Sequence, residues 1–151
     1  MSIRRHADSG FTIVEVLVAL VVLAIGLLGI AGLYVTTLGS GTAAINRMQA
    51  VNLATDIADR IRANRNANVA YAGAASTGLT CIGTGAVDCG AAQMAADDLL
   101  QWNTELAAAL PSGSGAIAVA GASAPYTYTI TITWSEPGQS SSQSYVMTVQ
   151  I

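Results

Sequence analysis

The pattern of apolar and polar positions changes along the chain, and its first part is an unbroken apolar run. Residues 16–35 read VLVALVVLAIGLLGIAGLYV and contain no charged residue. At about 1.5 Å per residue, a helix of this length crosses the roughly 30 Å hydrocarbon core of a bilayer. A secretory signal peptide has a shorter apolar region followed by its cleavage site, whereas here a polar leader ends at Ser9-Gly10, before the run. We therefore predict a transmembrane helix.

A second helical pattern follows a Gly39-Ser40-Gly41 step, which we expect to be flexible. Between residues 43 and 65, Leu53, Ile57 and Ile61 recur four residues apart, with charged residues between them. This is the spacing of an amphipathic helix. We therefore expect the membrane helix to continue outward into this segment.

The helical period is then lost before a second helix is predicted. Residues 64–90 are rich in Ala, Gly, Asn and Thr and contain both cysteines, Cys81 and Cys89. Thiols on the exported side of a membrane meet an oxidising environment, so we expect one disulfide that pins an irregular loop; two free buried thiols are the alternative.

From about residue 91 to residue 110 one helical face is apolar, and Pro111 with Gly113 ends the helix. That face consists of Leu99, Trp102, Leu106 and Leu110.

The last third of the chain alternates between apolar and polar residues with a period of two. Apolar residues alternate with threonines over residues 126–134, and the alternation returns over residues 145–151 after the turn-forming Pro137-Gly138. Residues 116–120 form a weaker first strand. Half-buried strands have this pattern. The sequence therefore predicts an α+β fold in which a long N-terminal helix packs on an antiparallel sheet of about three strands.

The charge balance supports a membrane anchor and gives its orientation. Only 10% of the residues are charged and the formal net charge is −3, whereas about 25% of the residues in a typical soluble domain are charged. Arg4 and Arg5 precede the apolar run, and no basic residue follows it until Arg47. The positive-inside tendency therefore places the N-terminus in the cytoplasm and the rest of the chain outside.

A cluster of arginines near the end of the amphipathic segment has two interpretations. Asp56 and Arg60 are four residues apart, and Asp59 and Arg62 are three apart. Ion pairs on the solvated side of the helix would then each contribute roughly a few tenths of a kcal/mol. The alternative is that Arg60, Arg62 and Arg65 form a patch for a partner protein or for DNA phosphates. Their acidic neighbours and the negative net charge argue against nucleic acid.

The residues that most enzymes need for catalysis are missing from the sequence. His6 is the only histidine and there is no lysine, which removes the usual general bases and Schiff-base nucleophiles. The cysteines lack CxxC spacing, so a zinc site is not indicated. Asp88 or Asp97-Asp98 with backbone oxygens is the remaining alternative for calcium, but adjacent residues on a helix diverge by about 100°. We predict no enzymatic activity, no cofactor and no metal site.

Glu15 is an acidic residue among the apolar residues at the start of the span. Its position distinguishes this N-terminal segment from an ordinary membrane anchor. An ionised carboxylate there costs roughly a few kcal/mol unless it lies at the interface or is paired. Gly10-Phe11-Thr12-Ile13-Val14-Glu15-Val16-Leu17 resembles the class III signal of type IV pilins and type II secretion pseudopilins. The resemblance implies cleavage after Gly10 by prepilin peptidase, methylation of Phe11, and an assembly ion pair between the Phe11 amine and Glu15 of a neighbouring subunit. A plain signal anchor with Glu15 at the headgroup level is the alternative.

The resemblance also implies a division of the chain. Residues 1–10 are then the leader, residues 11–38 the transmembrane and assembly helix, and residues 39–151 a periplasmic globular domain that includes the outer half of the helix.

Three glycines recur every third residue on the span, namely Gly26, Gly29 and Gly32. We expect them to let another helix approach closely; the alternative is that they weaken the helix so that it partly melts in a filament.

Within this group the chain resembles the PilV-type minor pilins. Residues 59–64 (DRIRAN), the Cys81 to Cys89 loop, and residues 98–102 (DLLQW) through Leu110-Pro111 carry that likeness. It implies a minor pilin that primes or supports type IV pilus assembly in a tip complex with other minor pilins and the major pilin, and so supports adhesion and twitching motility. It also implies a single-span inner-membrane protein with a periplasmic C-terminus that enters the pilus on the cell surface. An I-type pseudopilin of type II secretion and a DNA-uptake pilin are the alternatives.

Overall fold

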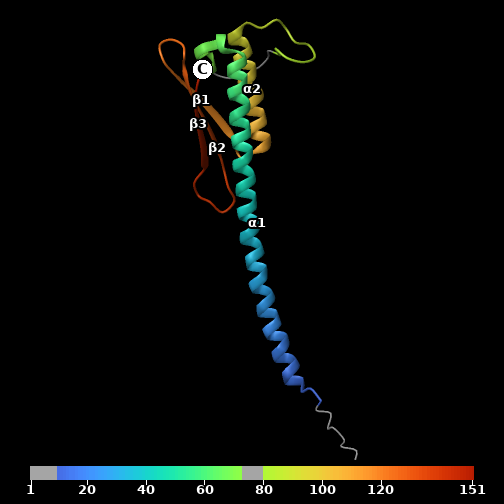
Figure 1. Cartoon of the computed structure of the whole chain (residues 1–151). Coiled ribbons are helices and arrows are strands. Elements are labelled where there is room, and N and C mark those ends of the chain that lie inside the picture. Colours follow the sequence, from blue (N-terminus) through green and yellow to red (C-terminus); the bar gives the residue numbers. More distant parts are fainter. Residues whose placement is uncertain (1–9, 73–79) are drawn as a thin grey trace, which may run out of the picture. The chain divides into compact units, whose positions relative to one another are not determined.

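The computed structural model describes residues 10–72 and 80–151, which divide into two compact units between Gly41 and Thr42. The predicted leader up to residue 9 and loop residues 73–79 lie outside the described residues. The elements in chain order are α1 (Ile13–Ala63), the 3-10 helix η1 (Arg65–Ala72), α2 (Ala91–Ala109), β1 (Ser114–Ala120), β2 (Thr127–Trp134) and β3 (Gln143–Gln150) (Figure 1). This order confirms the predicted α+β fold, and α1 contributes residues to both units.

The first unit contains the apolar half of α1. Every residue from 10 to 41 is exposed within the chain, and among the described residues α1 is the only helix long and apolar enough to cross a membrane. The Gly39-Ser40-Gly41 step, where we expect flexibility, is part of the helix. Nearby hydroxyls donate to carbonyl oxygens one turn earlier, Thr36 and Thr37 to Leu33 and Ser40 to Thr36. Such bonds satisfy polar groups inside the helix itself, as a segment without surrounding water requires.

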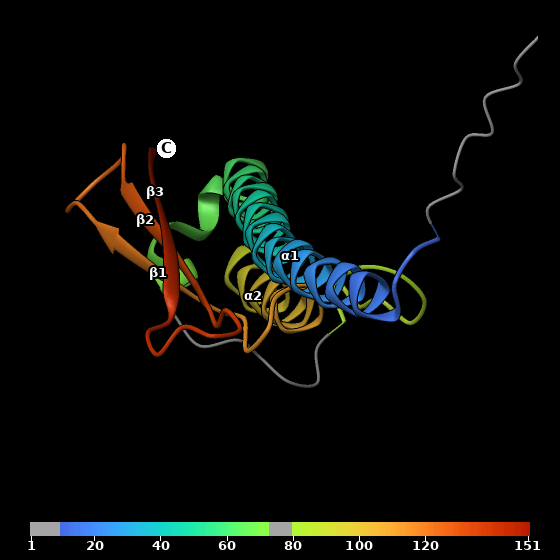
Figure 2. The same ribbon diagram turned by 90° about the horizontal axis from the view of Figure 1, so that it is seen from below.

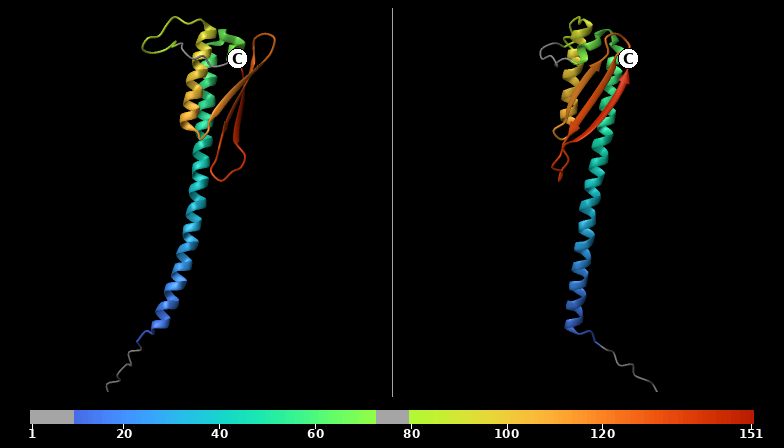
Figure 3. Two further views of the ribbon diagram at one scale, coloured as in Figure 1. Left: turned by 180° about the vertical axis from the view of Figure 1, so that it is seen from behind. Right: turned by 90° about the vertical axis from the view of Figure 1, so that its left-hand side faces the viewer.

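The second unit has two layers, with the sheet covering two helices. Residues 42–63 of α1 and the whole of α2 form one layer, and the sheet lies across them (Figures 2 and 3). The strand order is β1-β2-β3 and both neighbouring pairs are antiparallel, which confirms the predicted meander. Along β2 the half-buried threonines alternate with buried residues that face the core, which are Tyr128, Ile130, Ile132 and Trp134.

Trp102 lies at the centre of the core. It is fully buried, and its indole Nε1 donates to the carbonyl oxygen of Leu53 at 3.0 Å, which ties α2 to α1. Gly115 on β1 leaves room for the ring, because a Cβ at this position would lie 2.3 Å from Cη2 of Trp102. The predicted apolar faces of both helices are buried, with Ile57 and Ile61 on α1 and Leu99, Leu106 and Leu110 on and after α2. Each such side chain contributes about 1.5–3 kcal/mol when it is buried.

The segment after α1 is partly helical, although we predict an irregular loop there. η1 consists of short turns joined by a kink at Asn68, where φ is 49° and ψ is −119°. A residue other than glycine is strained in this region. The buried Tyr128 on β2 holds the kink, because its hydroxyl donates to the carbonyl oxygen of Asn68 at 3.1 Å. A segment this short and rich in Ala and Asn has no hydrophobic period from which a helix could be predicted.

Candidate functional site

The segment that carries the processing motif begins outside the helix. Gly10, Phe11 and Thr12 are not helical, and Phe11 is 84% exposed. Helix α1 begins at Ile13, and Thr12 caps it. The backbone N–H of Glu15 donates to Oγ1 of Thr12 at 3.3 Å and to its carbonyl oxygen at 3.1 Å. The peptide bond after Gly10, where we predict cleavage, is therefore accessible and in a non-helical conformation.

Glu15 lies in the first turn of α1, three residues after the capping Thr12. A threonine followed by a glutamate at this spacing is the capping box, and a negative side chain in the first turn interacts favourably with the helix dipole. The capping role of Thr12 was not predicted, although the Thr-x-x-Glu spacing is a known signal for it. Glu15 therefore has a local role at the start of the helix, while the predicted ion pair with a neighbouring subunit stays a prediction.

The glycines of the span lie on an open helix surface. Apart from the adjacent residues and the backbone of α1 itself, no described atom lies within 4 Å of the position that a Cβ would take at Gly26, Gly29 or Gly32. Helix α1 is continuous through all three residues. This surface leaves room for the close approach of another helix, and both uses predicted for the glycines stay predictions.

Arg60 lies between the two helices of the second unit. Its Nε is 2.8 Å from Oδ2 of Asp56 and its Nη2 is 3.0 Å from Oε1 of Glu105, while Nη1 donates to the side-chain oxygen of Gln101 at 3.3 Å. Burial lowers the pKa of Arg60, but Glu105 and Asp56 outweigh this effect, so that the pKa is raised overall. The predicted pair of Asp56 with Arg60 is confirmed. Its predicted place on the solvated side is wrong, because the Arg60 side chain is only 21% exposed and contacts α2.

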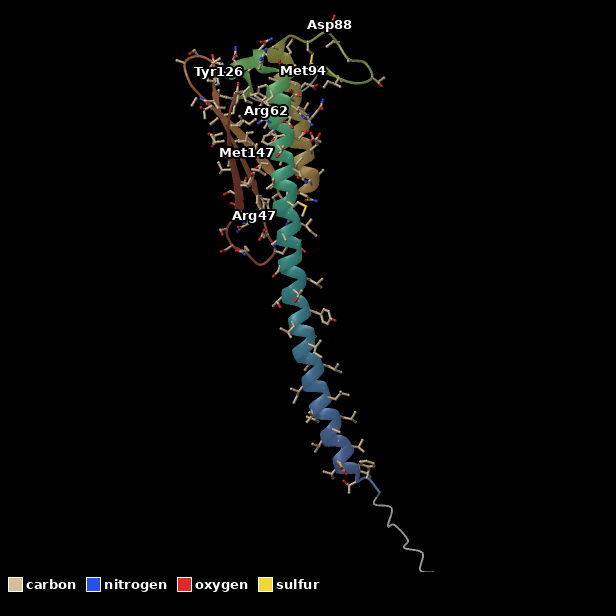
Figure 4. The ribbon with its side chains drawn as sticks, viewed as in Figure 1. Arg47, Arg62, Asp88, Met94, Tyr126 and Met147 are labelled. Carbon is tan, nitrogen blue, oxygen red and sulfur yellow. A yellow bond between two sulfur atoms is a disulfide. The ribbon has the colours of Figure 1, made fainter. Side chains whose placement is uncertain are left out.

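The other two arginines of the predicted patch remain exposed. Arg62 projects from the last turn of α1 (Figure 4) and pairs with Asp59, as predicted. Arg65 begins η1 and is exposed as well. A partner can therefore reach Arg62 and Arg65, whereas the Arg60 guanidinium is already engaged in holding α1 against α2.

A buried polar group lies beside Arg60. The hydroxyl of Tyr71 donates to Oδ2 of Asp98 at 2.6 Å, and Nη1 of Arg60 is 4.0 Å from Oδ1 of the same carboxylate. Burial is the main cause that raises the pKa of Tyr71, and the hydrogen bond to Asp98 raises it further. Burial also raises the pKa of Asp98 and outweighs the opposing effects of Tyr71 and Arg60.

The predicted disulfide is present and is attached to α2. Cys81 is bonded to Cys89, which confirms the pairing. The backbone N–H of Cys81 donates to Oδ2 of Asp97 at 3.2 Å, and the side-chain amide of Gln101 donates to the same oxygen at 3.0 Å. Asp97 and Asp98 thus bind different protein donors. Within residues 10–72 and 80–151, no group of three or more His, Cys, Asp or Glu side chains could hold a metal ion.

The segments on which the predicted resemblance to PilV-type pilins rests come together in this region. Arg60 and Asn64 belong to the first segment, and Asn64 donates from Nδ2 to the carbonyl oxygen of Ala91 at 2.8 Å. The disulfide loop contacts Asp97, and the last segment begins at Asp98. Residues far apart in the sequence therefore form one cluster in which the end of α1, η1, the disulfide loop and α2 are joined.

Two protein-family models match consecutive parts of the chain. The family described as a prokaryotic N-terminal methylation motif matches residues 5–31, and the family described as type IV pilin Tt1218 matches residues 32–100. The searches of curated proteins and of solved structures return no match. The first match covers the cleavage motif and most of the apolar run, and the second covers the rest of α1, η1 and the first half of α2. With the accessible Gly10-Phe11 bond, the capped apolar helix and the C-terminal meander, these matches show that the chain is a type IV pilin-like protein.

Proposed function

We propose that this pilin-like chain is a minor pilin that primes or supports type IV pilus assembly. Its leader, residues 1–10, is removed and Phe11 is methylated. It then joins other minor pilins and the major pilin in a tip complex that supports adhesion and twitching motility. Before assembly, residues 11–38 anchor the chain in the inner membrane and residues 39–151 lie in the periplasm. The observation that carries the proposal is the exposed, non-helical bond between Gly10 and Phe11, directly ahead of a capped helix with Glu15 in its first turn.

The mechanism of docking follows from the charge and exposure of this segment. Cleavage after Gly10 creates an amine on Phe11, and burial of this cation or of the Glu15 carboxylate in a filament costs free energy unless each is paired. An ion pair between Phe11 of one subunit and Glu15 of the next offsets that cost. The apolar side chains along residues 13–41 are exposed within the chain, so they are covered by lipid before assembly and by neighbouring helices afterwards.

Processing is tested by intact mass and N-terminal sequencing of the protein from cells with and without prepilin peptidase. We expect a chain that starts at methylated Phe11 in the first strain and an uncut chain in the second. An uncut N-terminus in both strains contradicts the proposal and leaves a membrane-anchored protein of another kind.

Incorporation into filaments is tested by Glu15→Gln. Glutamine is also accepted at this place in a capping box, so the variant removes the charge with little change to the start of the helix. We expect normal processing but loss of the variant from sheared pili. The matched control is Asp59→Asn, which removes an exposed carboxylate elsewhere on α1 and should be incorporated normally. Equal incorporation of both variants excludes the ion pair.

Deletion of the chain tests the choice of filament. We expect fewer pili and reduced twitching motility in the deletion strain. Failure of protein export with intact pili favours the I-type pseudopilin of type II secretion instead. Salt-sensitive DNA binding by the purified chain, lost in an Arg62→Gln and Arg65→Gln double variant, would favour a DNA-uptake pilin.

A further inference from the structure

A pocket of about 430 Å³ lies where the end of α1, the disulfide loop and the start of α2 meet. All of the residues that line it belong to the second unit. The apolar part of its wall consists of Ala63, Ile82, Cys89, Ala91 and Met94. Ala63 and Ile82 are exposed, so a ligand can reach the pocket from solvent. An apolar wall with a few polar groups is typical of ligand sites.

The polar part of the wall includes the carboxylate of Asp98, which is buried. The residue is only 4% exposed. Its Oδ2 accepts the hydrogen bond from Tyr71, whereas Oδ1 is 4.0 Å from Nη1 of Arg60, which is too far for a hydrogen bond. None of the hydrogen bonds among the described residues uses Oδ1. A ligand in the pocket can therefore supply the donor that this buried oxygen lacks.

The charges around the pocket favour a cation over an anion. Arg60 also lines the pocket, but its donors are already used within the chain. They face Asp56, Glu105 and Gln101. Three carboxylates share this one guanidinium, namely those of Asp56, Asp98 and Glu105. Burial is the main cause that raises the pKa of Asp98, and a cation bound beside its carboxylate would oppose this effect.

The single free oxygen of Asp98 distinguishes between kinds of cation. A guanidinium binds a carboxylate best through two parallel hydrogen bonds, and Oδ2 of Asp98 is already bonded to Tyr71. An ammonium group is compact and can donate to one oxygen alone. We propose that the pocket binds a primary ammonium group on a short alkyl chain, with the ammonium at Asp98 and the alkyl chain against the apolar wall.

The ammonium group has two sources outside this protein. Residues 1–151 contain no lysine, so no side chain of this chain or of a second copy provides the group. It belongs either to a lysine of a different protein or to a free alkylamine, and both present the same chemistry to Asp98. The inference does not rest on the proposed function, because no residue of the processing motif or of the apolar span lines the pocket.

Binding is tested by NMR titration of the full chain in detergent micelles with n-butylamine and with Nα-acetyl-lysine methylamide. We expect saturable shifts of the Met94 methyl group with both probes. Asp98→Asn keeps an oxygen for the Tyr71 hydroxyl but removes the charge, and should weaken both by about tenfold or more. The matched control is Asp88→Asn, which removes an exposed carboxylate from the disulfide loop outside the pocket (Figure 4). It should bind as tightly as the native chain. Absence of binding, or equal weakening in both variants, overturns the proposal.

Two further probes and a second variant separate the ammonium group from its alkyl chain. Nα-acetyl-norleucine methylamide keeps the alkyl chain without the charge, and Nα-acetyl-arginine methylamide carries a guanidinium. Both should bind about tenfold more weakly than the lysine derivative. Ala63→Leu narrows the pocket without altering Asp98, so it should weaken binding even if Asp98→Asn fails to fold. A norleucine or arginine derivative that binds as tightly as the lysine derivative overturns the proposal.

Crosslinking in intact cells distinguishes the two sources. Arg62→Cys places an exposed thiol next to the pocket-lining Ala63, and a reagent with one maleimide and one succinimidyl ester joins it to a nearby amine; the native cysteines are bonded to each other and do not react. A protein adduct that is lost with Asp98→Asn and retained with Asp88→Asn identifies a lysine as the source. Binding in micelles without such an adduct identifies a free alkylamine. Cleavage after Gly10 is measured in the same cells, so that a correctly processed chain that does not bind the probes refutes this inference alone.

Discussion

The hydroxyl of Tyr71 donates a 2.6 Å hydrogen bond to Oδ2 of Asp98 in the interior of the second unit. Tyr71 lies on η1 and Asp98 on α2, so the bond fastens the segment after α1 to the second helix. Tyr71→Phe keeps the ring but leaves a buried carboxylate without its shortest donor. We expect a loss of about 1–3 kcal/mol in the free energy of unfolding, measured by urea denaturation of the full chain in detergent micelles.

The control for this variant is Tyr126→Phe. Tyr126 is half-buried, and none of the hydrogen bonds seen among the described residues uses its hydroxyl. Its substitution should change the free energy of unfolding by less than about 0.5 kcal/mol. Equal losses in the two variants would contradict a specific role of the bond between Tyr71 and Asp98.

Alkaline pH should destabilise the second unit through its buried tyrosines. Burial is the main cause that raises the pKa of Tyr71 and of Tyr128 above the ordinary value. Above about pH 10 the unfolded chain therefore loses these protons while the folded chain keeps them, so stability falls as pH rises. Each tyrosine can contribute at most about 1.4 kcal/mol per pH unit to this slope. Urea midpoints between pH 8 and pH 11 should fall above pH 10, and the fall should be shallower in Tyr71→Phe.

The two paired arginines of α1 should differ in their effect on stability. Arg60→Gln removes the bond to Asp56 within α1 and the bond to Glu105 on α2, and hydrogen bonds to charged groups contribute about 1.5–3 kcal/mol. Arg62→Gln removes only an exposed pair with Asp59, for which less than about 1 kcal/mol is expected. The same unfolding assay compares them. If Arg62→Gln is the more damaging variant, the interhelical role assigned to Arg60 is wrong.

Periodicity was sufficient to predict the elements that build the core. The alternation that ends at Trp134 and the i, i+4 spacing of Ile57 and Ile61 each mark one face of a regular element. Burial of the apolar face against another layer contributes the largest favourable free energy to the packing of such an element. The predicted faces are the buried faces in the structure, with the helices on one side of the sheet.

The polar contacts of the cluster could be predicted only where both partners are close in the sequence. The pair of Asp56 and Arg60 follows from helical spacing, but the contact of Arg60 with Glu105 joins residues 45 apart and depends on how α2 packs. The kink at Asn68 likewise depends on Tyr128, which is 60 residues later. Local spacing carries no information about either contact. Thr12 is the contrary case, since its capping role follows from a motif of four residues.

Loss of the disulfide should weaken the loop that it closes. Cys81 and Cys89 are eight residues apart, and the loop-entropy model gives roughly 2 to 3 kcal/mol for so short a loop. We expect a loss of this size in a Cys81→Ser and Cys89→Ser double variant, measured by urea denaturation. Treatment of the native chain with a reductant serves as the control, because it should lower stability by a similar amount and leave the double variant unchanged. Equal stability of the native chain and the variant would argue against this estimate.

Gly115 should be intolerant of any side chain because of its place over Trp102. A Cβ there would lie 2.3 Å from Cη2 of Trp102 and 2.6 Å from Cδ1 of Leu106, and overpacking of this kind costs about 1–3 kcal/mol. Gly115→Ala should lower the free energy of unfolding by at least this amount. A double-mutant cycle with Trp102→Phe identifies the cause, since the smaller ring leaves space for the new methyl group. The loss in the double variant should be smaller than the sum of the two single losses, whereas strict additivity would show that the methyl group and the indole do not compete for the same space.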